Sequence, residues 1–134
     1  MYKLIIKTEK DKEVIDITEK VNDFLKNERI GEGVVNLFLT HTTAALTTAD
    51  LDPGGTELDY LEAFEKIIPK LNYRHPHNPS HMPDHILASL IGSSLSLPFL
   101  DNKLVLGIWQ RVVLFEFDGP KKREIIISLI NSSN

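Results

Sequence analysis

The sequence predicts an α+β fold dominated by strands, with residues 1–134 forming one domain. Most apolar segments are short, rich in β-branched and aromatic residues, and bounded by turn residues, which is typical of strands. Three segments carry apolar residues at the three- and four-residue spacing of short helices. Because helices and strands do not alternate strictly, we expect sandwich-like mixed or antiparallel sheets instead of a doubly wound parallel sheet.

Four strands are expected in the first half of the chain. The first two are rich in strand-forming residues and are separated by a polar turn, so we expect them to form an opening hairpin. The third is apolar enough to be mostly buried, and it ends next to His41. These strands are expected at residues 2–8, 14–17, 33–40 and 44–49.

Each of the three expected helices has one apolar face. The first begins at Thr18, which is placed to cap it, and stops at Gly31. The second follows a turn of Asp, Pro and Gly residues, and the third begins at a proline, which is favoured in a first helical turn. These two helices are expected at residues 56–69 and 83–92, with an extended, ordered loop between them.

The second half of the chain ends in a β-rich region. Its segments have strand composition, and the last two are joined through the turn-forming residues 118–120. Four strands are expected there, at residues 94–97, 103–106, 110–117 and 123–130.

Composition excludes several classes of function. A net charge of −4 disfavours a broad nucleic-acid surface, and the basic run at residues 121–123 reads more simply as a solvated turn. No apolar run is long enough to span a bilayer, so we expect no membrane partner and a soluble, cytoplasmic protein. Because the chain has no cysteine, any metal must be held by nitrogen and oxygen ligands.

Four of the five histidines fall within residues 73–85, which points to a metal or acid–base site. His81 and His85 are four residues apart and would share one helix face. His75 lies in the preceding loop, whereas His77 stands between two prolines and is the expected bystander. The alternative is that these are surface histidines bonded to backbone carbonyls.

His41 heads a second polar run, and its neighbours Thr42 and Thr43 carry hydroxyl donors that suit phosphate or carboxylate oxygens. We therefore expect the two histidine segments to meet. Each observation has a simpler reading, because a histidine at a strand end is often structural and threonine is common in strands.

Three residues of the second half are further candidates. Trp109 and Gln110 could read a heterocycle by stacking and hydrogen bonding, although a core tryptophan is an equal alternative. Glu116 lies in an apolar strand, where an inward carboxylate must be paired or functional. An outward position in the strand alternation would be its other explanation.

Several separated motifs, in order along nearly the whole chain, resemble the YjbQ-like family, whose members are often called secondary thiamine-phosphate synthases. One departure is that residues 48–51 replace an Asn-Glu pair of many members, and whether Asp50 takes the place of that glutamate is open. The matching motifs lie at residues 41–47, 52–53, 73 and 75, 82–86, 92–95 and 98, 107–110, 116 and 123.

The resemblance implies a homotrimer of strand-dominated subunits that joins a pyrimidine diphosphate to a thiazole phosphate. It implies a site with a divalent metal ion, Zn²⁺ or Mg²⁺, and a phosphorylated small molecule as partner. The metal ligands would be His41, His75 and His85, with His81 as a further candidate. Catalytic roles would fall to His41, Gln110 and Glu116, and ligand contacts to Thr42, Thr43, Trp109 and Arg123.

Two other functions fit the same residues. A metal-dependent phosphate hydrolase would use histidine-bound metal to activate water. A non-catalytic module would bind a phosphorylated metabolite or a metal without turnover.

Overall fold

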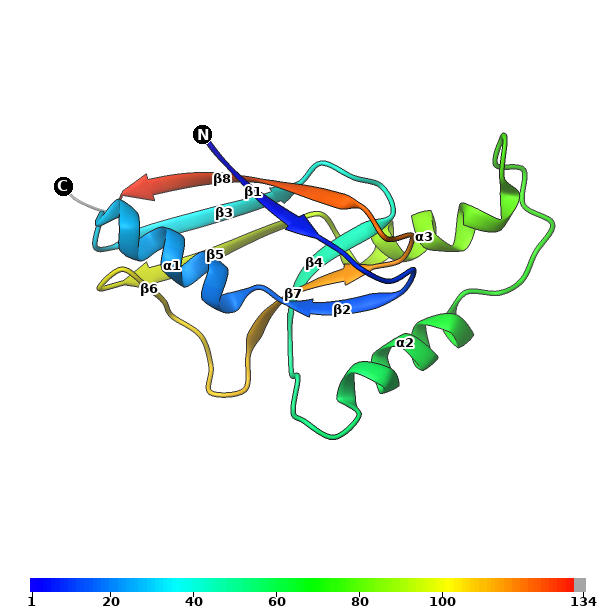
Figure 1. The fold of residues 1–134 in the computed structure, drawn as a ribbon, viewed down its shortest axis with the longest axis horizontal. Helices are drawn as coiled ribbons and strands as arrows, with labels where there is room; N and C mark the ends of the chain where they lie inside the picture. Colours follow the sequence, from blue (N-terminus) through cyan, green and yellow to red (C-terminus); the bar gives the residue numbers. More distant parts are fainter. Residues whose placement is uncertain (132–134) are drawn as a thin grey trace.

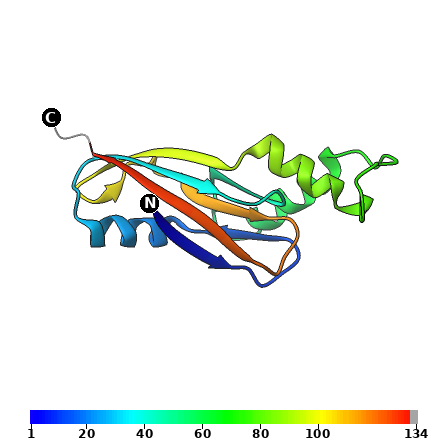
Figure 2. The same cartoon turned by 90° about the horizontal axis from the view of Figure 1, so that it is seen from above.

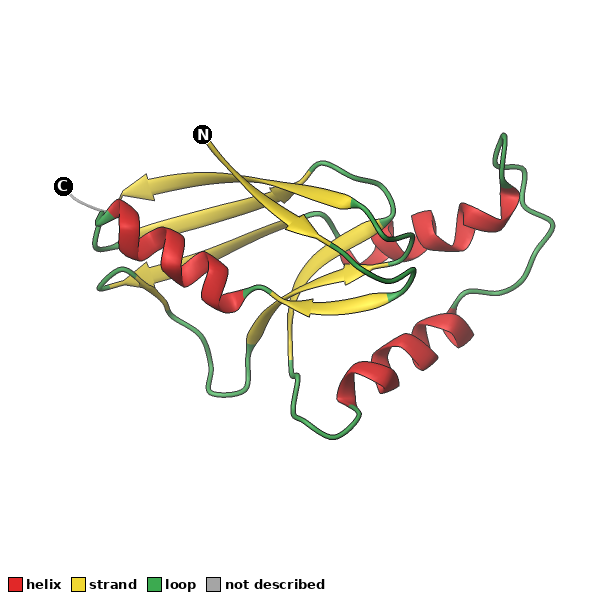
Figure 3. Cartoon of the chain, viewed as in Figure 1, coloured by secondary structure: helices red, strands yellow, loops and turns green. Residues whose placement is uncertain are grey.

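The computed structural model describes residues 1–131 and confirms the strand-dominated α+β fold (Figure 1, Figure 3). Helices are α1 (Thr18–Glu28), α2 (Thr56–Ile67) and α3 (Met82–Ile91), and a 3₁₀ turn, η1 (Pro79–His81), precedes α3. Strands are β1 (Tyr2–Lys7), β2 (Glu13–Asp16), β3 (Gly33–Leu39), β4 (Ala44–Ala49), β5 (Ser94–Leu100), β6 (Lys103–Leu104), β7 (Arg111–Glu116) and β8 (Lys122–Asn131).

The strands form two antiparallel sheets. The larger sheet has the order β1-β8-β3-β5-β6 and the smaller has the order β2-β7-β4. The predicted opening hairpin is therefore wrong, because β1 pairs with β8 while β2 pairs with β7. The residues between β1 and β2 lack a two-residue hairpin turn such as Asn-Gly, and they carry the chain from one sheet to the other.

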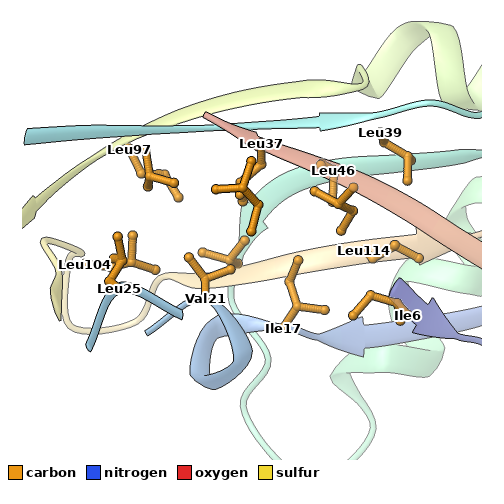
Figure 4. Packing of buried hydrophobic residues seen from close by; sticks show 14 of the residues in the cluster. Ile6, Ile17, Val21, Leu25, Leu37, Leu39, Leu46, Leu97, Leu104 and Leu114 are labelled. Atoms are coloured by element: carbon orange, nitrogen blue, oxygen red, sulfur yellow. The ribbon is translucent and has the colours of Figure 1, made fainter. Parts of the chain in front are cut away.

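The smaller sheet is the middle layer of the molecule. Along β7, Val112 and Leu114 face the larger sheet, whereas Val113 and Phe115 face α2 and α3. Figure 4 shows the first of these cores, to which both sheets and α1 contribute buried aliphatic side chains. Burial on both faces explains why β7 is an unbroken apolar run in the sequence.

Helices α2 and α3 form the outer layer over the smaller sheet. Phe64 of α2 packs edge-on against Phe115, with ring centroids 5.0 Å apart, and Leu87 of α3 joins the same core. Figure 2 shows α3 and the loop before it extending past the sheets at one end, with α1 near the other. None of the helices within residues 1–131 is both long and apolar enough to cross a membrane.

Helix α1 begins as expected, but its predicted cap is wrong. Ile17 occupies the N-cap position, and Thr18 is the buried first residue of the helix. The Thr18 hydroxyl instead accepts the backbone N–H of Val112 at 2.8 Å, which ties the helix to β7. At the other end, Arg29 adopts the left-handed conformation and closes the helix before Gly31.

The other boundaries shift by a few residues. The strand expected at residues 94–97 continues to Leu100, the one expected at 103–106 is paired only over Lys103–Leu104, and β7 begins one residue after Gln110.

Candidate functional site

A polar cavity of about 400 Å³ lies where the β3–β4 connection, the β7–β8 connection and the start of α3 meet. It joins the two segments that the sequence predicts to meet, because both His41 and His85 line it. Its lining residues are Thr40, His41, Thr42, Thr43, His81, His85, Asp118, Lys121 and Arg123.

A buried ion pair between Arg123 of β8 and Glu116 of β7 forms the floor of the site. The two residues are 1% and 0% exposed. Arg123 Nε donates to Glu116 Oε1 at 2.9 Å, and Arg123 Nη2 donates to Glu116 Oε2 and to the Thr43 hydroxyl, the latter at 2.8 Å. The Thr8 hydroxyl donates to Glu116 Oε1 at 2.7 Å. Glu116 thus points inward and is paired.

One guanidinium nitrogen of Arg123 remains for the cavity. Nε and Nη2 have partners, but Nη1 has no hydrogen bond within the described residues. Since no buried side-chain nitrogen or oxygen there lacks a partner, Nη1 keeps contact with solvent. Glu116 and Thr43 therefore hold Arg123 in one orientation, with its free N–H groups available to an acceptor in the cavity.

A backbone hydrogen bond fixes which nitrogen of His41 carries the proton. Its Nε2 accepts the backbone N–H of Glu124 at 2.8 Å. Because that nitrogen must carry the lone pair, the proton of the neutral ring lies on Nδ1. Burial, and then the Arg123 guanidinium, lower the pKa of His41 below its usual value. In this orientation His41 offers a donor N–H and no free lone pair, so its predicted metal role would require loss of the hydrogen bond from Glu124.

His75 and His85 have the opposite arrangement. His85 Nδ1 lies 3.0 Å from the Thr42 carbonyl oxygen, and His75 Nδ1 lies 3.1 Å from the Asn78 carbonyl oxygen. Carbonyls only accept, so Nδ1 carries the proton in each ring and a neutral ring has its lone pair on Nε2. The rings stack with centroids 4.8 Å apart. Histidines that bind metals are commonly oriented in this way by a carbonyl.

His81 and two residues of the β7–β8 connection complete the cavity wall. His81 Nε2 lies 3.1 Å from the Asn78 amide nitrogen and 3.9 Å from Asp118 Oδ1. Partial burial works to raise the pKa of Asp118, but the Lys121 ammonium at 2.6 Å outweighs it and holds this pKa below its usual value. The wall therefore carries both signs of charge.

The predicted metal ligands His41, His75 and His85, with His81 as the further candidate, do not converge on one point within one chain. Among residues 1–131, no three His, Asp, Glu or Cys side chains lie together as a metal site requires. His75 and His85 form the pair that retains free imidazole nitrogens. Of these two, only His85 lines the cavity; His75 stacks on it from outside the lining, and His77 does not line the cavity either.

Trp109 and Gln110 lie at the opposite end of the smaller sheet. Gln110 accepts the Gly107 N–H at 2.8 Å and lies just before β7, and Trp109 is 65% exposed. The five residue steps from Arg111 to Glu116 separate the two ends by about 17 Å. One chain therefore does not bring these two residues to the cavity, and Asp50 follows β4 at the same distant end.

Sequence reasoning missed three residues of the site. Asp118 is predicted only as part of the turn between the last two strands, and Lys121 only as part of a solvated basic run, although both line the cavity. Thr8 lies 108 residues from Glu116 in the chain and carries no local signal.

The chain matches the family model described as UPF0047 protein YjbQ-like over residues 2–132. It is 38% identical to a UPF0047 protein of Archaeoglobus fulgidus, over 95% of this chain and 98% of that protein. It is 32% identical to the UPF0047 protein YugU of Bacillus subtilis, over 95% of this chain and 96% of YugU.

Solved structures agree with the fold. A YjbQ/UPF0047 family protein from Clostridium acetobutylicum has a TM-score of 0.85 and 36% identity, covering 97% of this chain and 100% of that one. The conserved hypothetical protein TT1486 from Thermus thermophilus has a TM-score of 0.86 and 31% identity, with the same coverage.

Proposed function

We propose that this chain, which belongs to the UPF0047, YjbQ-like family, is an enzyme acting on phosphorylated small molecules. The reaction proposed is a thiamine-phosphate synthase-like condensation of a pyrimidine diphosphate with a thiazole phosphate. The observation that carries the proposal is that Arg123, fixed by Glu116 and Thr43 and with Nη1 unpaired within the described residues, lines the same cavity as residues 41–43.

The proposed chemistry makes one bond and breaks another. The thiazole nitrogen attacks the methylene carbon of the pyrimidine, and the carbon–oxygen bond to the diphosphate breaks with its electron pair leaving on oxygen. Negative charge therefore grows on the diphosphate, where N–H and O–H donors stabilise it best. We assign this stabilisation to Arg123 Nη1, His41 Nδ1 and the hydroxyl groups of Thr42 and Thr43.

A divalent metal stays a prediction: His75 and His85 would supply two Nε2 ligands, and no third His, Asp, Glu or Cys side chain within residues 1–131 joins them. Its remaining ligands would have to come from water, the substrate phosphates or another copy of the chain. When bound, such an ion supplies positive charge to the leaving diphosphate. Glu116 does not touch substrate in this scheme. It is a positioning residue, because it is fully buried and holds Arg123.

Ring stacking by Trp109 and orientation by Gln110 stay predictions that depend on assembly. Within one chain both residues lie at the far end of the smaller sheet. The proposed homotrimer would have to bring them from a neighbouring copy to the cavity.

The test is formation of thiamine phosphate from the two phosphorylated precursors, with Mg²⁺ or Zn²⁺ present. We expect His85→Asn to lower kcat/KM about 100-fold, because it removes an imidazole nitrogen that is proposed to bind the metal beside the leaving diphosphate. The matched control is His77→Asn in the same loop, which should react like the wild type because His77 does not line the cavity.

Other results would assign the site differently. Equal rates for the wild type and His85→Asn would contradict the catalytic role of His85. Orthophosphate release from simple esters that stops on chelation would favour the hydrolase. Tight binding of the precursors with no product over hours would favour the binding module.

A further inference from the structure

A second cavity, of about 450 Å³, lies between α2, α3 and the β1–β2 connection. Its volume is within the range of small-molecule sites. Most of its wall is apolar and includes two aromatic rings. These apolar residues are Leu61, Phe64, Ile68, Pro83, Leu87 and Phe117.

A nearly buried carboxylate interrupts this apolar wall. Asp84 is 8% exposed, and its Oδ1 accepts Lys12 Nζ at 3.0 Å. Lys12 Nζ also donates to the Phe117 carbonyl oxygen, which fixes the ammonium at this end of the cavity.

The second oxygen of Asp84 has no partner within the described residues. Oδ2 has no hydrogen bond within residues 1–131, and it is not fully buried because every buried side-chain oxygen there has a partner. It also caps no backbone N–H of α3, in whose first turn it lies. Asp84 lines this cavity and not the histidine cavity. A poorly solvated oxygen without a donor is unfavourable, and a bound donor would remove that cost.

Acidic residues outnumber basic residues around the cavity. Asp11 lies 3.9 Å from Lys12 Nζ, so that Lys12 stands between two carboxylates. The lining also includes two further acidic residues, Glu62 and Glu65, and one further basic residue, Lys70. This balance attracts a cation and repels a carboxylate or phosphate.

We propose that the cavity between α2 and α3 binds a small organic cation, a protonated amine with an apolar or aromatic body. The ammonium donates to Asp84 Oδ2, and the body packs against the apolar wall. The rings of Phe64 and Phe117 add the attraction of aromatic faces for cations. This binding does not depend on the phosphate chemistry of the histidine cavity, which shares none of these residues.

Three probes of the same shape test the proposal on the full chain: 2-phenylethylammonium, neutral 2-phenylethanol and the anion phenylacetate. Binding is followed by titration of the assigned amide NMR spectrum. We expect the ammonium to bind with a Kd of about 1 mM or tighter and to shift amides of α2, α3 and residues 11–12. The alcohol and the anion should bind at least about tenfold more weakly.

Two cavity variants and one control variant locate the binding. Asp84→Asn should raise the Kd of the ammonium about 10- to 100-fold, because the charged acceptor is lost. Asp23→Asn removes the same charge from an exposed position of α1, far from the cavity, and should leave the Kd unchanged. Leu61→Trp, which places a larger side chain in the cavity, should also abolish binding and serves if Asp84→Asn fails to fold.

The proposal is overturned if the alcohol binds as well as the ammonium, if the shifted amides lie elsewhere, or if both cavity variants bind like the wild type. Failure here would leave the proposed condensation untouched, because that reaction is assayed separately.

Discussion

The buried ion pair of Glu116 and Arg123 is stable only because each charged group has hydrogen-bond partners. Both are almost inaccessible, and moving such charges out of water costs several kcal/mol unless hydrogen bonds replace the lost water. Here Thr8 and Thr43 complete the pair, so each charged group has more than one partner. The sequence marks Glu116 as a carboxylate that must be paired if inward, but it does not identify Arg123 as the partner.

Glu116→Leu is expected to lower the free energy of unfolding by about 3–5 kcal/mol, because Arg123 would remain buried without a counter-charge. The double variant Glu116→Leu/Arg123→Met should recover most of that loss. Urea denaturation measures both. As a control, Asp16→Asn breaks the exposed Asp16–Arg111 pair at 2.7 Å and should cost less than about 1 kcal/mol. Additive losses in the double variant would contradict this account.

At the scale of elements, local sequence patterns predict which segments are helices and strands. They do not predict the hydrogen bonds that join a helix to a strand. The apolar spacing of α1 is visible in the sequence, and the helix lies where it is expected. The role of Thr18 was misassigned because threonine is a common cap, while its real partner, the Val112 N–H, comes from a strand 94 residues away.

Thr18→Val is expected to lower the free energy of unfolding by about 1–3 kcal/mol, because it keeps the shape of the side chain but leaves the buried Val112 N–H without an acceptor. Thermal or urea unfolding measures the change. Thr40→Val is the matched control, since Thr40 is exposed and its hydroxyl contacts are long, at 3.4 Å, so its cost should stay within about 0.5 kcal/mol. Equal losses for the two variants would contradict the proposed role.

At the scale of the whole molecule, large apolar side chains remain exposed on one chain. Leu58 and Ile67 of α2 are 61% and 59% exposed, and Ile108 beside Trp109 is 89% exposed. Exposed apolar surface of this kind is often covered by another subunit. The proposed homotrimer would cover part of such surface, and it would also have to supply the Trp109 and Gln110 that one chain holds away from the cavity.

Light scattering after size-exclusion chromatography is expected to give about three times the chain mass of 15.2 kDa. Ile108→Glu should lower that mass if the loop before β7 lies in the interface, because it would bury a charge without a partner. A wild-type mass of one chain would contradict the homotrimer and would leave Trp109 outside the proposed site.

The sequence by itself determined the element types and most of their limits, the two histidine segments and the family, because periodicity, turn residues and motifs are local signals. Tertiary structure alone decided which strands pair, and so replaced the expected hairpin with strands in two sheets. It also decided that residues 41–43, His85 and Arg123 share one cavity while Gln110 does not. These outcomes depend on contacts between residues far apart in the chain, where burial and hydrogen bonding select one pairing among many.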